Sequence, residues 1–147
     1  MKRLLFVCLG NICRSPAADG IAKALVDHRN LDWQIDSAGT GGWHVGDPPD
    51  PRMVEAAAAR GIDLSPLRAR QAIARDFSDF DHVYAMDRSN LSNLRALQPV
   101  AAHASLDLFL GDAEVPDPYY GGKDGFDHVL DLISARMETL FDHLTAT

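Results

Sequence analysis

The stretch Val7-Cys8-Leu9-Gly10-Asn11-Ile12-Cys13-Arg14-Ser15-Pro16 directly follows the apolar run Leu4-Leu5-Phe6-Val7. The apolar run is typical of a buried central strand, and Ser15-Pro16 is typical of a helix N-cap and first helical position. Gly10 and Asn11 both tolerate positive φ, so the loop can turn its N–H groups inward as a nest for an anion. The stretch therefore predicts a strand, an anion-binding loop and a helix N-terminus in succession.

The two ends of this loop carry side chains suited to phosphoryl transfer. Helix N-termini and neighbouring cations favour the thiolate form of a cysteine, so we expect Cys8 to be a nucleophile. Arg14 offers a planar, permanently charged fork that binds two phosphate oxygens at once. A cation at a helix N-terminus opposes the helix dipole unless an anion binds there, which disfavours a plain surface role for Arg14.

The rest of the chain alternates strand and helix patterns, which predicts a parallel sheet with helices on both faces. Strand patterns cover residues 4–7, 33–38, 82–86 and part of 103–109. Helix patterns follow Pro16, Asp50-Pro51 and Asp87, and an apolar stripe from Phe126 to Leu144 marks the last helix. We expect a single three-layer α/β domain over residues 1–147, with four parallel strands in the flavodoxin-like order 2-1-3-4.

Segments that follow the later strands should surround the Cys8 loop, because ligands bind beyond the carboxyl ends of strands in such sheets. Trp43, Asp87 and Asp117 lie in such segments. Asp117 belongs to the proline-stiffened stretch Val115-Pro116-Asp117-Pro118-Tyr119-Tyr120-Gly121-Gly122. A carboxyl held there would protonate a leaving oxygen and then deprotonate a water. Asp-Pro alone is also common turn chemistry, and Asp112 and Glu114 are local competitors.

Composition and charge exclude several classes of protein. The chain has 147 residues, of which 46% are hydrophobic and 24% charged, the ordinary range of a globular domain. Lys and Arg number 14 against 21 Asp and Glu, and the formal net charge of -7 argues against a nucleic-acid partner. No apolar run approaches the length that spans a bilayer, so we expect neither a membrane span nor a signal peptide.

Cys8 and Cys13 are the two cysteines of the chain, and both lie in the same loop. A pair this close cannot staple a fold, so a disulfide framework is excluded and a reducing, cytoplasmic location is expected. For Cys13 two interpretations stay open. It either captures an oxidised Cys8 as a reversible disulfide or is a small buried side chain that lines the loop.

Several segments resemble the low-molecular-weight protein tyrosine phosphatase family, nearly from end to end of the chain. Beyond the Cys8 loop they are Asp36-Ser37-Ala38-Gly39-Thr40, Gly42-Trp43-His44-Val45-Gly46, Arg68-Ala69-Arg70-Gln71, Met86-Asp87-Arg88-Ser89-Asn90-Leu91 and Asp117-Pro118-Tyr119-Tyr120. The resemblance implies Cys8 as nucleophile, Arg14 as phosphate clamp and Asp117 as general acid and base. It implies a phosphate-binding loop of Leu9, Gly10, Asn11, Ile12, Cys13 and Ser15, and a substrate pocket walled by Trp43, Tyr119 and Tyr120.

Two supporting contacts are also expected from the resemblance. The hydroxyl of Ser15 hydrogen-bonds the catalytic thiolate in this family, and Ser37 is expected to support Asn11. One position departs from the family pattern. Many members carry a histidine immediately before the Arg68-Ala69-Arg70-Gln71 segment, where it hydrogen-bonds the loop asparagine, and this chain has Leu67 there.

Other functions fit the sequence less well. Arsenate reductases of the thiol-dependent type share this fold and loop, but they need two further cysteines, which the chain lacks. A metal-dependent aspartyl phosphatase would need carboxylates at a strand end, whereas Asp79-Phe80-Asp81 precedes a strand. A phosphotyrosine-binding module needs neither a thiolate nor an acid, so Cys8 and Asp117 together disfavour it. The histidines show no paired spacing typical of zinc.

We therefore expect a cytoplasmic, metal-independent hydrolase that uses no cofactor. Its expected reaction is the hydrolysis of protein phosphotyrosine, and of small aryl phosphate monoesters, through a cysteinyl phosphate. The expected partners are a phosphotyrosine-containing protein, for which family analogy suggests a bacterial tyrosine kinase, and inorganic phosphate as product and competitive ligand. Neither nucleic acid nor membrane is an expected partner.

Overall fold

Four parallel strands form one sheet in the computed structural model, which describes residues 1–119 and 121–146. The strands are β1 (Arg3–Cys8), β2 (Gln34–Gly39), β3 (His82–Ala85) and β4 (Ser105–Leu108). Their order in the sheet is β2-β1-β3-β4. The predicted α/β class, the parallel pairing and the order 2-1-3-4 are confirmed.

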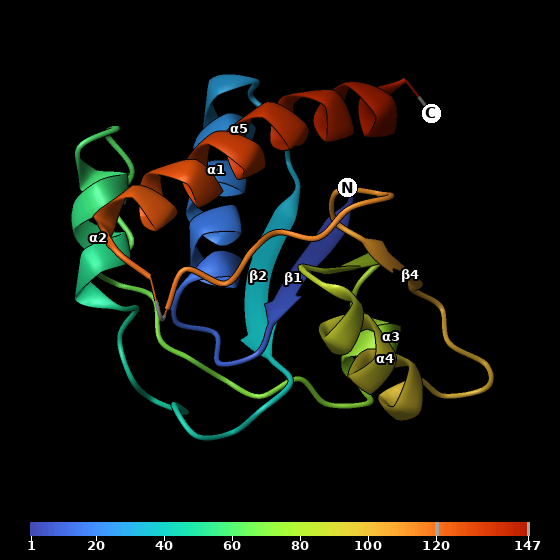
Figure 1. The fold of residues 1–147 in the computed structure, drawn as a ribbon. Coiled ribbons are helices and arrows are strands. Elements are labelled where there is room, and N and C mark those ends of the chain that lie inside the picture. Colours follow the sequence, from blue (N-terminus) through green and yellow to red (C-terminus); the bar gives the residue numbers. More distant parts are fainter. Residues whose placement is uncertain (120, 147) are drawn as a thin grey trace.

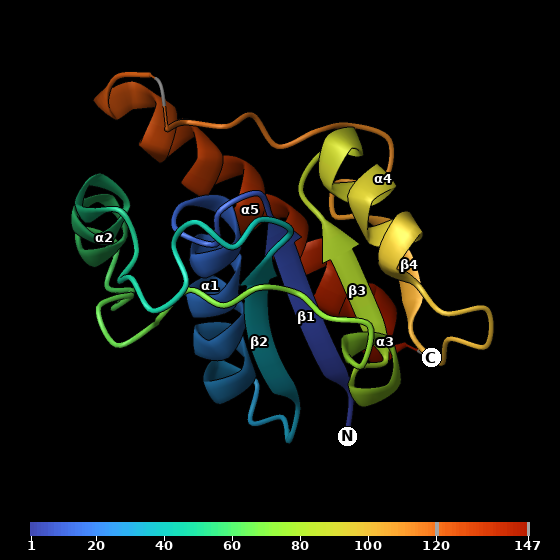
Figure 2. The ribbon, with the colours of Figure 1, turned by 90° about the horizontal axis from the view of Figure 1, so that it is seen from below.

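Helices cover both faces of the sheet (Figure 1). On one face α1 (Arg14–His28) packs against β1, β2 and α5 (Lys123–Thr145), and α2 (Pro51–Ala58) contacts α5. On the other face lie α3 (Asp76–Asp79) and α4 (Arg88–Leu97), as Figure 2 shows from below. The short helix α3 was not expected from the sequence, because four residues are too few to show a helical period.

The side chains of β1 alternate between two hydrophobic cores. Leu4 and Phe6 belong to the core under α1 and α5, whereas Leu5 and Val7 belong to the core on the side of α4. All four side chains are completely buried. Burial on both faces is the reason that this strand is a continuous apolar run rather than an alternating one.

Local sequence signals set the starts of two helices as expected. Asp50 is the N-cap of α2, and its carboxylate accepts a hydrogen bond of 2.9 Å from the N–H of Arg52. Asp87 is the N-cap of α4 and accepts a bond of 2.7 Å from the N–H of Asn90. The first helix differs, because it begins at Arg14 with Cys13 as N-cap rather than Ser15.

The carboxyl ends of β1 and β2 lie side by side, since Cys8 pairs with Gly39 in the register of the two strands. Figure 1 shows both arrowheads pointing to the edge where the loop after β1 turns into α1. This edge carries the residues of interest. Within the part of the chain that the structure describes, each helix is too short or too polar to cross a bilayer.

Candidate active site

The phosphate loop, residues 8–15, connects β1 to the first turn of α1. Cys13 caps this helix without a side-chain hydrogen bond among the described residues. The N–H groups of the first turn therefore have no capping side chain there, which is the arrangement that favours an anion at a helix N-terminus. Asn11 has the positive φ that was expected, 56°, whereas Gly10 is not among the glycines with positive φ.

Ser15 is a buried hydrogen-bonding centre beneath this loop. Its Oγ lies 3.0 Å from Sγ of Cys8 and accepts a bond of 2.8 Å from Nδ2 of Asn11. It also lies 3.3 Å from the carbonyl oxygen of Ala38 on β2. Ser15 is not an N-cap because its hydroxyl points back to the strand end instead of to the helix N–H groups. A hydroxyl in this place can donate to a thiolate on Cys8.

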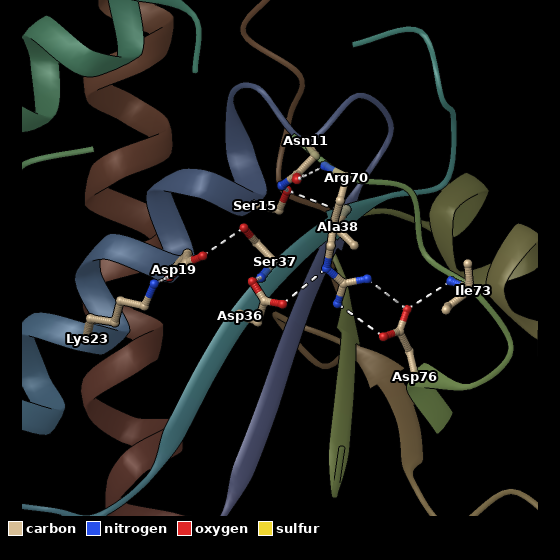
Figure 3. Close-up of polar contacts among 10 residues, drawn as sticks. All are labelled: Asn11, Ser15, Asp19, Lys23, Asp36, Ser37, Ala38, Arg70, Ile73 and Asp76. Carbon is tan, nitrogen blue, oxygen red and sulfur yellow. Dashed lines mark hydrogen bonds and ion pairs between the residues drawn. The ribbon is translucent and has the colours of Figure 1, made fainter. Parts of the chain in front are cut away.

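Asn11 is held by a main-chain group in place of the histidine that many family members use. Its Oδ1 accepts a bond of 3.0 Å from the N–H of Arg70 (Figure 3). Leu67, at the histidine position, packs instead against the core that contains α1 and α5. The left-handed conformation of Asn11 is thus fixed from two sides, by Ser15 and by Arg70.

The side chain of Arg70 anchors the segment that holds Asn11. Its two terminal nitrogens each lie 3.1 Å from a carboxylate oxygen of Asp76, and its Nε lies 3.1 Å from Asp36 (Figure 3). Asp76 is 4% exposed and also accepts a bond of 2.8 Å from the N–H of Ile73. A bidentate, largely buried pair of this kind fixes main-chain position better than a surface ion pair does.

Ser37 makes a different contact from the one expected. Its hydroxyl donates to Oδ2 of Asp19 at 2.8 Å, while Asn11 is bound by the groups described above. Asp19 is buried on α1 and pairs with Nζ of Lys23 at 2.8 Å. Burial raises the pKa of Asp19, and the bonds from Lys23 and Ser37 oppose that rise. Ser37 therefore joins β2 to α1 below the loop rather than supporting Asn11 directly.

Gly39 allows β2 to approach the phosphate loop closely. A Cβ atom on this residue would lie 2.8 Å from the carbonyl oxygen of Leu9 and 3.1 Å from the nitrogen of Asn11. The N–H groups of Thr40 and Gly41 donate to the carbonyl oxygens of Cys8 and Leu9, each at 2.9 Å. The end of β2 thus fixes the main-chain position of the first residues of the loop.

Arg14 is almost completely buried and is held by the N-cap residue of α4 and by the segment before α5. Its NH1 donates to Oδ2 of Asp87 at 2.7 Å and to the carbonyl oxygen of Val115 at 3.0 Å. Its NH2 lies 3.6 Å from Oδ2 of Asp117. Burial lowers the pKa of Arg14, but the negative charges of Cys8, Asp87 and Asp117 outweigh burial and raise it on balance.

These groups meet at one pocket of about 270 Å³. Its walls are Cys8, Leu9, Gly10, Ile12, Cys13, Arg14, Trp43, His44, Asp117 and Tyr119. Trp43 and Tyr119 are 73% and 39% exposed, so both stand at the rim. Oδ1 of Asp117 accepts a bond of 3.0 Å from the N–H of Tyr119. Tyr120, the third expected wall residue, lies outside the described residues.

Comparison with known proteins identifies the architecture. The family model for low molecular weight phosphotyrosine protein phosphatases matches residues 3–147. The chain belongs to this family. It is 46% identical to the low molecular weight phosphotyrosine protein phosphatase of Schizosaccharomyces pombe, with 84% of this chain and 85% of the relative covered. It is 40% identical to the low molecular weight protein-tyrosine-phosphatase YfkJ of Bacillus subtilis, with 95% and 94% covered.

A solved structure of a family member has the same fold. The protein tyrosine phosphatase of Entamoeba histolytica, crystallised with Hepes in the active site, superposes with a TM-score of 0.94 at 36% identity, covering 99% of this chain and 98% of the other. Family membership makes the chain a protein-tyrosine phosphatase and therefore a hydrolase. Phosphotyrosine is the substrate class that belongs to this family.

Three residues of this phosphatase site were not assigned a role from the sequence. Asp87 was noted as a helix start and for its place after β3, but not as a partner of Arg14, and its bond to Arg14 joins residues 73 positions apart. His44 lines the pocket beside Trp43. Arg52 bonds the carbonyl oxygen of Tyr119 at 2.9 Å. A signal for Asp87 existed, because a carboxylate at the carboxyl end of a neighbouring strand is a natural partner for a buried cation in this loop.

Proposed function

We propose that this family member hydrolyses phosphotyrosine through a phosphocysteine at Cys8, with Arg14 as phosphate clamp and Asp117 as general acid and base. The observation that carries the proposal is that one pocket of about 270 Å³ is lined by the thiol, the guanidinium and the carboxyl together. Cys8 and Arg14 come from the phosphate loop, whereas Asp117 comes from the segment before α5, far along the chain.

In the first step Sγ of Cys8 attacks phosphorus as a thiolate. The S–P bond forms, the P–O bond to the tyrosine ring breaks, and the protonated carboxyl of Asp117 gives its proton to the departing phenolate oxygen. The hydroxyl of Ser15, 3.0 Å from Sγ, stabilises the thiolate before attack and again when it is regenerated.

Arg14 and the phosphate loop stabilise the transferred group. Asp87 and Val115 hold the guanidinium by NH1, so that the opposite edge of the fork is directed at two phosphate oxygens. The N–H groups of Leu9, Gly10, Asn11, Ile12 and Cys13, with the first turn of α1 at Ser15, complete the cradle.

In the second step a water oxygen attacks phosphorus on the side that the tyrosine has left. The carboxylate of Asp117 accepts a proton from this water, the S–P bond breaks, and inorganic phosphate is released together with the Cys8 thiolate. No metal ion or cofactor takes part in either step. Inorganic phosphate, as the product, binds the same loop and competes with substrate.

The rim explains a preference for aryl phosphates. Trp43 and Tyr119 present exposed aromatic faces beside the pocket, and Tyr120 follows in the sequence. Such faces stack on a phenyl ring and hold the phosphate ester at the depth of the thiol. Phosphoserine lacks the ring and has a shorter reach.

The wider setting of the enzyme is proposed from the sequence and the family. We place it in the cytoplasm, because both of its cysteines are free thiols. Residues 1–147 act as one domain, and the protein substrate is a phosphotyrosine protein such as a bacterial tyrosine kinase.

The test is steady-state hydrolysis of a phosphotyrosine peptide in the presence of a metal chelator, with a phosphoserine peptide for comparison. The wild type should cleave only the phosphotyrosine peptide. Cys8→Ser should abolish turnover but still bind the peptide, and Asp117→Asn should lower kcat/KM by about 10²-fold, the typical contribution of a general acid. Substantial hydrolysis by Cys8→Ser would contradict the proposed mechanism.

A further inference from the structure

Arg52, in the first turn of α2, connects two loops that come from opposite halves of the chain. Its NH2 donates to the carbonyl oxygen of Tyr119 at 2.9 Å. Its Nε and NH2 also bond the two carboxylate oxygens of Asp50 at 3.1 and 2.9 Å. One guanidinium thus spans from the cap of α2 to the segment that contains Asp117.

The Asp50 end of this connection is fixed to the phosphate loop. The N–H of Asp50 donates to the carbonyl oxygen of Ile12 at 2.8 Å, and Asp50 is 8% exposed. Its carboxylate caps α2 through the N–H of Arg52. The hydrogen bond from the Arg52 side chain lowers the pKa of Asp50, so this carboxylate stays charged and bound at neutral pH. Asp50 therefore places Arg52 relative to the phosphate loop.

The Tyr119 end is fixed to the proposed acid. Tyr119 binds Arg52 through its carbonyl oxygen and Asp117 through its N–H, which donates to Oδ1 of Asp117 at 3.0 Å. The guanidinium carbon of Arg52 also lies 4.7 Å from the ring centre of Phe126 and 5.6 Å from that of Tyr119. Phe126 is completely buried on α5, so the plane of the guanidinium is set by a rigid side chain.

We propose that Arg52 is a positioning residue that sets the distance between Asp117 and the phosphate loop. A general acid must come within about 2.6–3.2 Å of the oxygen that it protonates, and a displacement of about 1 Å is enough to cost orders of magnitude in rate. Arg52 acts through Tyr119 and does not touch the substrate. The inference rests on the proposed role of Asp117.

Only the fork of an arginine fits this connection. The carboxylate of Asp50 and the carbonyl of Tyr119 require several donors in one plane, whereas the ammonium of a lysine is a compact point charge. A role in attracting phosphate would depend on charge alone, and Asp50 already balances the charge of Arg52. Replacement of Arg52 by lysine keeps the positive charge but loses the planar donors, so it distinguishes positioning of the Asp117 segment from attraction of phosphate.

The experiment compares kcat/KM for two substrates that need the acid to different degrees. Phenyl phosphate has a poor leaving group that needs a proton, whereas 2,4-dinitrophenyl phosphate releases a stable phenolate without one. The variants are Arg52→Met, Arg52→Lys and Asp117→Asn, with the double variant Arg52→Met in Asp117→Asn. Arg60→Met is the matched control, because Arg60 also bridges to α5, through Asp131 and the carbonyl oxygen of Asp127, away from the pocket.

We expect Arg52→Met and Arg52→Lys to lower kcat/KM for phenyl phosphate by about tenfold, part of the effect of a general acid, and for the dinitrophenyl ester by less than about twofold. Arg60→Met should change neither substrate. In the Asp117→Asn background, Arg52→Met should have no further effect. The inhibition constant of inorganic phosphate should stay within about twofold in Arg52→Met, because the phosphate loop itself is intact.

Each contrary outcome has a distinct meaning. The positioning role of Arg52 would be overturned if Arg52→Met lowered kcat/KM equally for the two substrates, or if it lowered kcat/KM just as much in the Asp117→Asn background. It would also be overturned if Arg52→Lys had the kcat/KM of the wild type, or if Arg52→Met weakened inhibition by phosphate. Equal losses on both substrates in Asp117→Asn alone would overturn the acid role of Asp117, and the inference with it. A selective loss in Asp117→Asn with none in Arg52→Met would leave the acid in place and reject Arg52.

Discussion

At the scale of single residues, the site depends on how one buried cation is oriented. Arg14 is 2% exposed, and such a charge is tolerated only when it is paired. Asp87 pairs with this charge and also fixes its direction. Its Oδ2 binds Arg14 at 2.7 Å, while its Oδ1 caps α4. One carboxylate therefore couples the start of a helix to the direction of the guanidinium.

Replacing Asp87 by asparagine tests this coupling. Asp87→Asn keeps an oxygen for the N–H of Asn90 but puts an amide beside NH1 of Arg14, so we expect kcat/KM for a phosphotyrosine peptide to fall about tenfold or more through misorientation of the clamp. Asp87→Ala also removes the cap and should cost about 1 kcal/mol more in the free energy of unfolding. Steady-state kinetics and urea unfolding measure the two effects. Wild-type activity in Asp87→Asn would show that Val115 alone orients Arg14.

At the scale of elements, the end of β2 shapes the phosphate loop. The carbonyl oxygens of Cys8 and Leu9 accept bonds from Thr40 and Gly41, and the absence of a side chain on Gly39 lets the two segments approach. The segment of Arg70 holds the other side of Asn11. The loop is thus preorganised by the neighbouring strand and by a segment farther along the chain.

Gly39→Ala should disturb this arrangement. The new Cβ would lie 2.8 Å from a backbone oxygen, which cannot move aside as a flexible side chain does. We expect kcat/KM to fall by about 10²-fold, as for a displacement of about 1 Å, and the free energy of unfolding to fall by about 1–3 kcal/mol.

The matched control is Gly125→Ala in α5, where a Cβ would meet Pro118 at an ordinary distance of 3.6 Å. It should leave activity unchanged and raise the free energy of unfolding by up to about 1 kcal/mol, since alanine favours helix over glycine. Unimpaired turnover in Gly39→Ala would mean that the loop does not depend on the close approach of β2.

At the scale of the whole molecule, the pocket and a cluster of stabilising ion pairs lie at opposite edges of the sheet. The carboxyl edge carries the pocket, whereas the opposite edge carries Asp81, whose carboxylate bonds the N–H and side chain of Arg3 and Nε2 of His103. Burial raises the pKa of Asp81, but the bonds from His103 and Arg3 outweigh burial and hold this pKa well below its ordinary range.

The sign of the resulting pH dependence follows from linkage. A carboxyl with a lowered pKa in the folded state contributes stability above its unfolded pKa, about 3.9, and loses it as pH falls toward the folded value. We expect Asp81→Asn to lower the free energy of unfolding by about 1 kcal/mol at pH 7, and this difference should shrink steadily below about pH 4. Urea unfolding at several pH values measures it.

A control for Asp81 is Asp131→Asn, which removes an ion pair whose carboxylate is 69% exposed. It should change the free energy of unfolding by less than about 0.5 kcal/mol at either pH. Activity of Asp81→Asn at neutral pH should equal that of the wild type, because Asp81 lies at the edge away from the pocket. A difference for Asp81→Asn that persists undiminished at pH 3 would assign its effect to shape rather than charge.

The sequence by itself determined the four strands and the four longer helices, in their order along the chain. The apolar run 4–7, the caps Asp50 and Asp87 and the stripe of α5 are local patterns, and local patterns report hydrophobic periodicity and capping directly. The loop from Cys8 to Arg14 also sufficed to propose nucleophile and clamp, because seven consecutive residues contain both. Asp117 was proposed as the acid from the family resemblance of Asp117-Pro118-Tyr119-Tyr120, because an Asp-Pro pair alone is also common turn chemistry.

Only the tertiary structure decided how the site is supported. Arg14 is bound by Asp87, Asn11 by the main chain of Arg70, and Ser37 by Asp19. The observed start of α1 differs from the predicted one, because Ser15 bonds to the end of β2 rather than capping the helix. A main-chain N–H can come from almost any residue type, so the sequence does not reveal which one binds Asn11. Contacts across 59 or 73 positions form only when the sheet brings distant segments to one edge. The chemistry of the loop is thus local, whereas its geometry is set by the whole fold.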